Sequence, residues 1–158
     1  MKFFSDHSLI EDEVIKTTAK SVMEYRAHLE EVSKKTDYSD FESPIQLPFD
    51  ENLLSAVQDV VQKIKAPTLQ YVVVIGIGGS NLGTQAVYNA IAGSMSLLYD
   101  RLPKLLFLDT VSDERMTAVV RMLSRMPSKE DFAVIAISKS GGTTETIANT
   151  EVLWKSLD

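Results

Sequence analysis

The sequence predicts an α/β protein built on a parallel sheet. The run 71–75 is apolar without alternation, which suits a strand buried on both faces. Two further largely apolar runs follow at 104–109 and 132–137. Helical patterns separate the three runs, and alternating β and α elements imply parallel strands joined by right-handed crossovers.

Composition and charge narrow the possible partners. The chain has 158 residues, enough for one domain with a core, and no cysteine, which excludes disulfides, thiolate metal sites and cysteine nucleophiles. A net charge of −6 argues against nucleic acid or a membrane surface, but a local site can still bind a phosphorylated substrate. Neither a signal peptide nor an apolar run of about 20 residues is visible, so we expect a soluble, cytoplasmic protein.

Residues 1–66 are expected to form a helical lead and connector. Ser8 begins a capping-box pattern, and the helix after it is expected to run to about Lys35. The connector 37–50 contains two prolines and several apolar residues, so we expect it to pack across a surface. Asp50 is expected to cap a second helix with one buried apolar face.

Residues 67–158 are expected to carry the sheet. The helix between the first two strands begins near residue 82. Ser112 or Asp113 is expected to cap a further helix. The last helix runs through Trp154, which we expect to be a packing residue.

The first strand ends in a glycine-rich turn. Gly76, Gly78, Gly79 and Gly83 follow it, with Ser80 among them. Glycines at the carboxyl end of a buried strand let the backbone turn sharply and approach a ligand closely. A strand, such a turn and a helix N-terminus together form a ready site for an anion, here a phosphate.

The third strand ends in a second loop of similar chemistry, at 138–146. The loop contains one cation, Lys139, two glycines and five hydroxyls, those of Ser138, Ser140, Thr143, Thr144 and Thr146. These donors at a helix N-terminus suit the oxygens of a phosphate, although the loop could also serve only to cap the helix. Because ligands bind outside the carboxyl ends of parallel strands, both loops can face one crevice.

Two other phosphate-binding motifs fit less well. A P-loop requires lysine after its last glycine, and Thr84 stands there. A dinucleotide fingerprint requires a third glycine where Asn81 stands. Asp109 ends the second strand, where a ribose-binding acid could lie, but it is further along the chain than the usual spacing. A Rossmann-type nucleotide binder therefore remains as an alternative.

The two loops resemble signatures of a known family. Residues 75–83 (IGIGGSNLG) and 137–146 (ISKSGGTTET) are similar to the phosphate-side motifs of glucose-6-phosphate isomerase. The resemblance covers nearly the whole chain. It implies the sugar-isomerase (SIS) fold, a three-layer, flavodoxin-like parallel sheet of about five strands with helices on both faces. This chain would carry about three of them, in the order 2-1-3.

The same resemblance implies a function and a set of site residues. The family interconverts glucose 6-phosphate and fructose 6-phosphate in glycolysis and gluconeogenesis, without a metal or organic cofactor. A dimer is implied for the full-length enzyme. The substrate phosphate would be bound by four side chains and by the backbone of two further residues: Ser80, Ser138, Ser140 and Thr143, with Gly79 and Lys139. Glu145 matches a glutamate near the substrate that is not the principal base.

The catalytic groups of the family have no match in this chain. The reaction needs a histidine for ring opening and a glutamate to move a proton between C1 and C2. Neither His7 nor His28 corresponds to that histidine. We therefore expect a phosphate-binding piece without the base. A non-catalytic sugar-phosphate-binding SIS module is an alternative.

The order 2-1-3 has a physical consequence. It leaves the strand 132–137 at the edge of the sheet, and this strand contains no proline or charge to protect it. We therefore expect the isolated chain to associate with itself through that edge.

Overall fold

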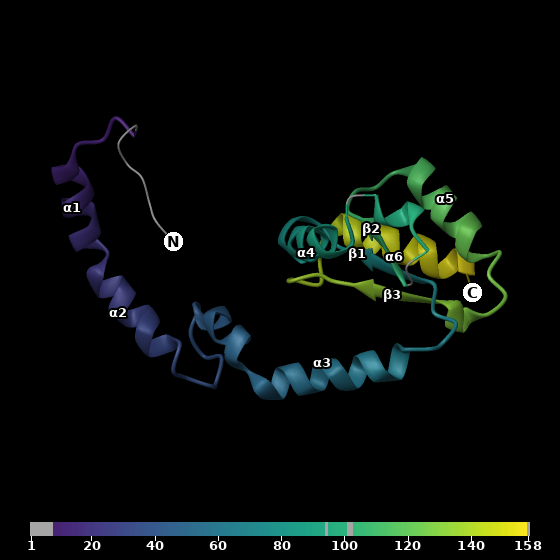
Figure 1. Cartoon of the computed structure of the whole chain (residues 1–158), viewed down its shortest axis with the longest axis horizontal. Coiled ribbons are helices and arrows are strands. Elements are labelled where there is room, and N and C mark those ends of the chain that lie inside the picture. The colour runs from purple at the N-terminus through teal and green to yellow at the C-terminus, as the bar shows by residue number, and fades with distance from the viewer. Residues whose placement is uncertain (1–7, 94, 101–102, 158) are drawn as a thin grey trace. The chain divides into compact units, whose positions relative to one another are not determined.

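The computed structural model describes residues 8–93, 95–100 and 103–157 of the chain. The chain divides into two compact units, Met1–Val60 and Val61–Asp158. The first unit is helical and the second contains the sheet (Figure 1).

The first unit begins with two short helices rather than the single helix expected up to Lys35. Helix α1 spans Asp12–Ser21 and α2 spans Met23–Val32. Val22 separates them because its ψ angle of 1° lies outside the helical range. The capping box predicted at Ser8 is also wrong, since Glu11 occupies the N-cap position and, among the described residues, no side chain caps the helix.

The connector forms a 3₁₀ helix, η1, over Ser43–Phe49. It is attached to α2 by the buried amide of Gln46, whose Nε2 donates to the carbonyl oxygen of Val32 over 3.0 Å. The expected packing of the apolar connector residues is only partly realised, because Phe41 and Phe49 are 92% and 75% exposed.

Helix α3 spans Glu51–Ile64 and begins as the sequence predicts. The carboxylate of Asp50 accepts a hydrogen bond from the Leu53 N–H over 2.8 Å, as an N-cap does. The expected buried face is not found, since none of the α3 residues is buried in the described structure.

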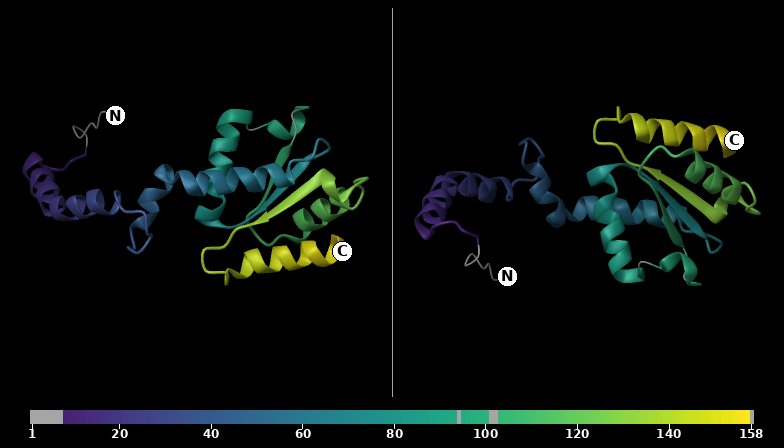
Figure 2. Two further views of the ribbon diagram at one scale, coloured as in Figure 1. Left: turned by 90° about the horizontal axis from the view of Figure 1, so that it is seen from below. Right: turned by 90° about the horizontal axis from the view of Figure 1, so that it is seen from above.

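The second unit contains a three-stranded parallel sheet in the order β2-β1-β3. Strand β1 spans Tyr71–Ile75, β2 spans Lys104–Leu108 and β3 spans Phe132–Ala136. The register pairs Tyr71 with Lys104 on one side and with Phe132 on the other. The predicted α/β class and strand order 2-1-3 are therefore confirmed, and β1 is the central strand (Figure 2).

Helices flank both faces of this sheet. On one face, α5 (Asp113–Leu123) and α6 (Thr144–Leu157) pack against β1 and β2. The side chains at the centre of this core are all nearly inaccessible: Val73, Ile75, Leu108, Met116, Leu123 and Leu153. On the other face lies α4 (Leu82–Ala92), whose Tyr88 ring is 6.1 Å from that of Phe107 in β2.

Two helix-level predictions of this unit have different outcomes. Ser112 caps α5, because its Oγ accepts the N–H of Arg115 over 3.3 Å. Trp154 does not pack as expected, since it is 72% exposed on α6. In the described part of the chain, every helix is too short or too polar to cross a bilayer.

Candidate functional site

The first glycine-rich turn follows β1 directly. Residues Gly78–Ser80 form a 3₁₀ turn, η2, which Gly78 enters with a positive φ of 57°. Helix α4 starts immediately afterwards, and the N–H of Gln85 donates to the carbonyl oxygen of Asn81 over 3.0 Å. The strand, turn and helix N-terminus expected from the sequence are therefore consecutive here.

Asn81 is an important residue of this turn that the sequence analysis used only to reject a fingerprint. Its side chain is fully buried, and Nδ2 donates to the carbonyl oxygen of Gly76 over 3.1 Å. Because the amide is turned toward Gly76, it does not cap α4. Among the described residues, the first N–H groups of α4 therefore have no capping side chain, as an anion site requires.

The second loop is organised by the hydroxyl of Ser138. Its Oγ accepts the N–H of Gly141 over 3.0 Å and lies 3.0 Å from Oγ1 of Thr143. Gly141 adopts a positive φ of 70°, which allows the chain to fold back over Ser138. Thr143 then leads into α6, because its carbonyl oxygen accepts the N–H of Ile147 over 3.0 Å.

The two loops start side by side at the carboxyl ends of β1 and β3. The N–H of Ile137 donates to the carbonyl oxygen of Ile75 over 2.8 Å. A Cβ atom placed on Gly76 would lie 3.2 Å from the carbonyl oxygen of Ile137 and 3.1 Å from Cβ of Ser80. Glycine is therefore needed at position 76, where a side chain would meet residues of both loops.

The other predicted site residues lie along these two loops with differing exposure. Ser80 and Glu145 are half-buried, whereas Gly79 and Lys139 are exposed. Ser140 is exposed as well, and its Oγ accepts the N–H of Gly142 over 3.2 Å. The exposed backbone at these positions leaves room for a ligand above the strand ends.

Two further polar residues lie on the first turns of α6: Thr146, which the sequence analysis named only among the loop hydroxyls, and Asn149, which it did not name. Asn149 donates from Nδ2 to the carbonyl oxygen of Thr110, the second residue after β2, over 3.1 Å. Thr146 is buried, and within the described structure its Oγ1 has no hydrogen-bond partner. Their spacing of three residues places both on one face of α6, which is the only sequence signal that could have identified them together.

Asp109, considered above as a ribose-binding acid, is engaged elsewhere. Its Oδ1 lies 3.2 Å from Nη1 of Arg115 on α5. Within the described residues, we find no cluster of three or more acidic or histidine side chains that could hold a metal ion.

This geometry defines a class of protein: an α/β protein whose parallel sheet ends in two adjacent glycine-rich, hydroxyl-rich loops. The family model of phosphoglucose isomerase matches residues 11–157. The chain belongs to the phosphoglucose isomerase family.

Individual relatives agree with this assignment. A glucose-6-phosphate isomerase of Carboxydothermus hydrogenoformans is 33% identical over 80% of this chain and 27% of its own length. One from Staphylococcus haemolyticus is 30% identical over 92% of this chain and 30% of its own. A probable glucose-6-phosphate isomerase of Methanococcus maripaludis is 37% identical over 49% of this chain and 17% of its own.

A solved structure is similar as well. The crystal structure of a hypothetical protein, TT0462 from Thermus thermophilus, matches with a TM-score of 0.57 and 28% identity, over 88% of this chain and 32% of that one. The chain thus spans less than a third of the length of these relatives.

Proposed function

We propose that this chain supplies the phosphate-binding part of an enzyme that interconverts glucose 6-phosphate and fructose 6-phosphate. Membership of the family supports the reaction class, and the geometry of the Ser138 loop beside the Gly76 turn supports the binding role. The observation that carries the proposal is the hydroxyl pair of Ser138 and Thr143, 3.0 Å apart at the N-terminus of α6.

The chemistry of this site suits a phosphate dianion. The hydroxyls of Ser80, Ser138, Ser140 and Thr143 would donate to the phosphate oxygens, together with backbone N–H groups of Gly79 and Lys139. The N-termini of α4 and α6 add partial positive charge at the same end of the sheet, beside the carboxyl ends of the strands. The exposed ammonium of Lys139 adds a full positive charge to the loop.

The proposed division of labour follows from what these residues can do. Serine and threonine hydroxyls bind and orient a phosphate, but they do not move a proton between carbon atoms at neutral pH. Glu145 is the carboxylate in the first turn of α6 and would act as an auxiliary group near the sugar. The residues of this site would therefore hold the substrate while other groups perform ring opening and proton transfer.

The test is a titration of the ¹⁵N-labelled chain followed by heteronuclear NMR. Fructose 6-phosphate should shift the amide signals of residues 79–80 and 138–143. Fructose is the matched control, since it lacks only the phosphate, and it should leave those signals in place. Equal shifts with both sugars, or none with either, would refute the proposal. Shifts with NAD at the same residues would favour a nucleotide binder instead.

A further inference from the structure

Asn149 is a buried polar residue on the second turn of α6, where it is 4% exposed. A buried amide costs free energy unless its polar atoms are hydrogen-bonded. Its Nδ2 donates to the carbonyl oxygen of Thr110 over 3.1 Å, across 39 residues of the chain. Both partners are described residues of this chain, so the bond joins α6 directly to the loop that follows β2.

The acceptor of this bond is held in place on both sides along the chain. Before Thr110, the carbonyl oxygen of Leu108 accepts the N–H of Gly76 over 3.2 Å, which continues the pairing of β2 with β1. After Thr110, the hydroxyl of Ser112 caps α5 by accepting the N–H of Arg115. The Thr110 carbonyl oxygen is therefore a fixed point at the carboxyl end of the sheet.

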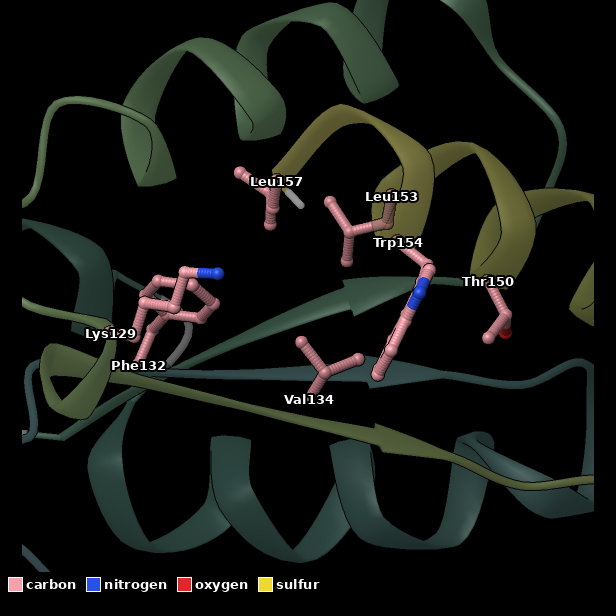
Figure 3. Close-up of a pocket in the computed structure, with 7 residues that line it drawn as sticks. All are labelled: Lys129, Phe132, Val134, Thr150, Leu153, Trp154 and Leu157. Atoms are coloured by element: carbon pink, nitrogen blue, oxygen red, sulfur yellow. The ribbon is translucent and has the colours of Figure 1, made fainter.

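The core contacts of α6 are apolar and set its position along its axis less sharply than a hydrogen bond does. Leu153 and Leu157 point from α6 toward the strands (Figure 3), and Leu153 is 2% exposed. Apolar burial is non-directional, whereas a hydrogen bond requires a narrow range of distance and angle. Among the described residues, only Asn149 makes a side-chain hydrogen bond from α6 to another part of the chain.

The start of α6 is also the end of the Ser138 loop. Thr143 leads into the helix, and its hydroxyl lies 3.0 Å from that of Ser138. Asn149 follows Thr143 by six residues, which is about 9 Å along the helix axis. A shift of the helix by about 1 Å is enough to take a 3.0 Å contact beyond the range of a good hydrogen bond.

We propose that Asn149 is a positioning residue of the phosphate-binding site. Its amide is buried and bonded to Thr110, so it does not touch the ligand. It fixes α6 along its axis and thereby holds the Thr143 hydroxyl and the N-terminus of α6 against the Ser138 loop. This inference rests on the proposed function, because the ligand for which the loop is held is the sugar phosphate.

The first test is calorimetric titration of the 158-residue chain with fructose 6-phosphate. Asn149→Leu keeps a side chain of similar size without a donor, and it should bind roughly fivefold or more weakly than the parent. Leu153→Ala is the matched control, since it removes core packing on the same helix. It should lower the stability in urea but keep the parental affinity. Equal affinity losses in the two variants would overturn the proposal.

Asn149→Asp provides a conditional rescue. A protonated carboxyl group can donate to the Thr110 carbonyl oxygen, whereas a carboxylate cannot. Burial raises the pKa of such a carboxyl group, so the bond is present at low pH and is lost as the pH rises through the raised value. The affinity of this variant, relative to the parent at the same pH, should therefore fall with rising pH. The affinity of Asn149→Leu relative to the parent should stay constant, and identical profiles for the two variants would contradict the role of the donor.

A measurement without ligand separates this inference from the proposed function. The N–H of Gly141 donates to Oγ of Ser138 over 3.0 Å, so its exchange with water reports on the shape of the loop. NMR should detect faster exchange of this amide in Asn149→Leu, and in Asn149→Asp at high pH, but not in Leu153→Ala. Parental exchange in both Asn149 variants would overturn the positioning role, whether or not the chain binds a sugar phosphate. A parent chain that does not bind fructose 6-phosphate would refute the proposed function, and the Gly141 exchange would still decide whether Asn149 positions the loop.

Discussion

At the scale of single residues, the hydroxyl of Ser138 holds its loop in shape by contacting two later residues of the same loop. Its Oγ contacts both the Gly141 N–H and the Thr143 hydroxyl. We predict that Ser138→Ala weakens fructose 6-phosphate binding by about 1–2 kcal/mol, or roughly 5–30-fold, because one charge-assisted bond is lost and the loop is loosened. Isothermal titration calorimetry measures this loss.

A matched control for that prediction lies on helix α6, which follows this loop. Ser156 donates from Oγ to the Val152 carbonyl oxygen near the other end of α6. Ser156→Ala should leave the affinity unchanged. If Ser138→Ala also binds with parental affinity, Ser138 takes no part in the site.

Gly76 is a second residue with a specific steric role. An added Cβ would meet Cβ of Ser80 at 3.1 Å and the Ile137 carbonyl oxygen at 3.2 Å, and neither can move without shifting a loop. We predict that Gly76→Ala lowers the free energy of unfolding in urea by about 1–3 kcal/mol. Gly83→Ala, with no atom within 4 Å of its Cβ, should be neutral or slightly stabilising, as expected for alanine inside a helix. Equal stability of the two variants would contradict the steric argument.

At the scale of elements, the start of α3 is expected to depend on pH. The Leu53 N–H and the Tyr38 hydroxyl bond to the carboxylate of Asp50, and both lower the pKa of Asp50. A lowered pKa means that the stabilisation is present above the ordinary aspartate pKa and is lost as the pH falls through the lower value of the folded chain. We predict that the first turn of α3 frays on acidification, which NMR shifts of residues 51–54 would reveal.

The variant Asp50→Asn separates this cap from general acid unfolding. Asparagine can still cap the helix, but it does not titrate in this range. Its first turn should therefore lose the pH dependence. Identical acid profiles for Asp50→Asn and the parent chain would show that other carboxylates control the transition.

The elements also show which features a sequence can predict. The strands were predictable because unbroken apolar runs such as 71–75 suit a sheet covered on both faces. The break between α1 and α2 at Val22 was not predictable, because neither glycine nor proline marks it. The exposure of Trp154 was missed as well, because a residue's neighbours depend on which strands lie next to its helix.

The site shows the same division between local and tertiary information. Ser138 and Thr143 could be proposed from their loop chemistry, and the structure places their hydroxyls 3.0 Å apart. The roles of Asn81 and Asn149 could not be proposed from the sequence. Their side-chain amides donate to the carbonyl oxygens of Gly76 and Thr110, respectively, and tertiary packing positions these acceptors.

At the scale of the whole molecule, we predict that the 158-residue chain alone has negligible isomerase activity. By the family resemblance, a histidine opens the sugar ring, and neither histidine of this chain matches it. His28 lies on α2, with Nε2 3.5 Å from Oε2 of Glu42, and His7 lies outside the described residues. A coupled assay with fructose 6-phosphate tests this prediction, and turnover near that of a full-length family member would contradict it.

The hydroxyl of Tyr88 joins helix α4 to the outer strand β2. The N–H of Leu105 points away from β1 and donates to this phenolic oxygen over 3.4 Å. The ring of the same tyrosine lies 6.1 Å from that of Phe107. Loss of that single oxygen, as in Tyr88→Phe, would leave the Leu105 N–H without this acceptor while the ring contact is kept, and urea unfolding should detect the lower stability.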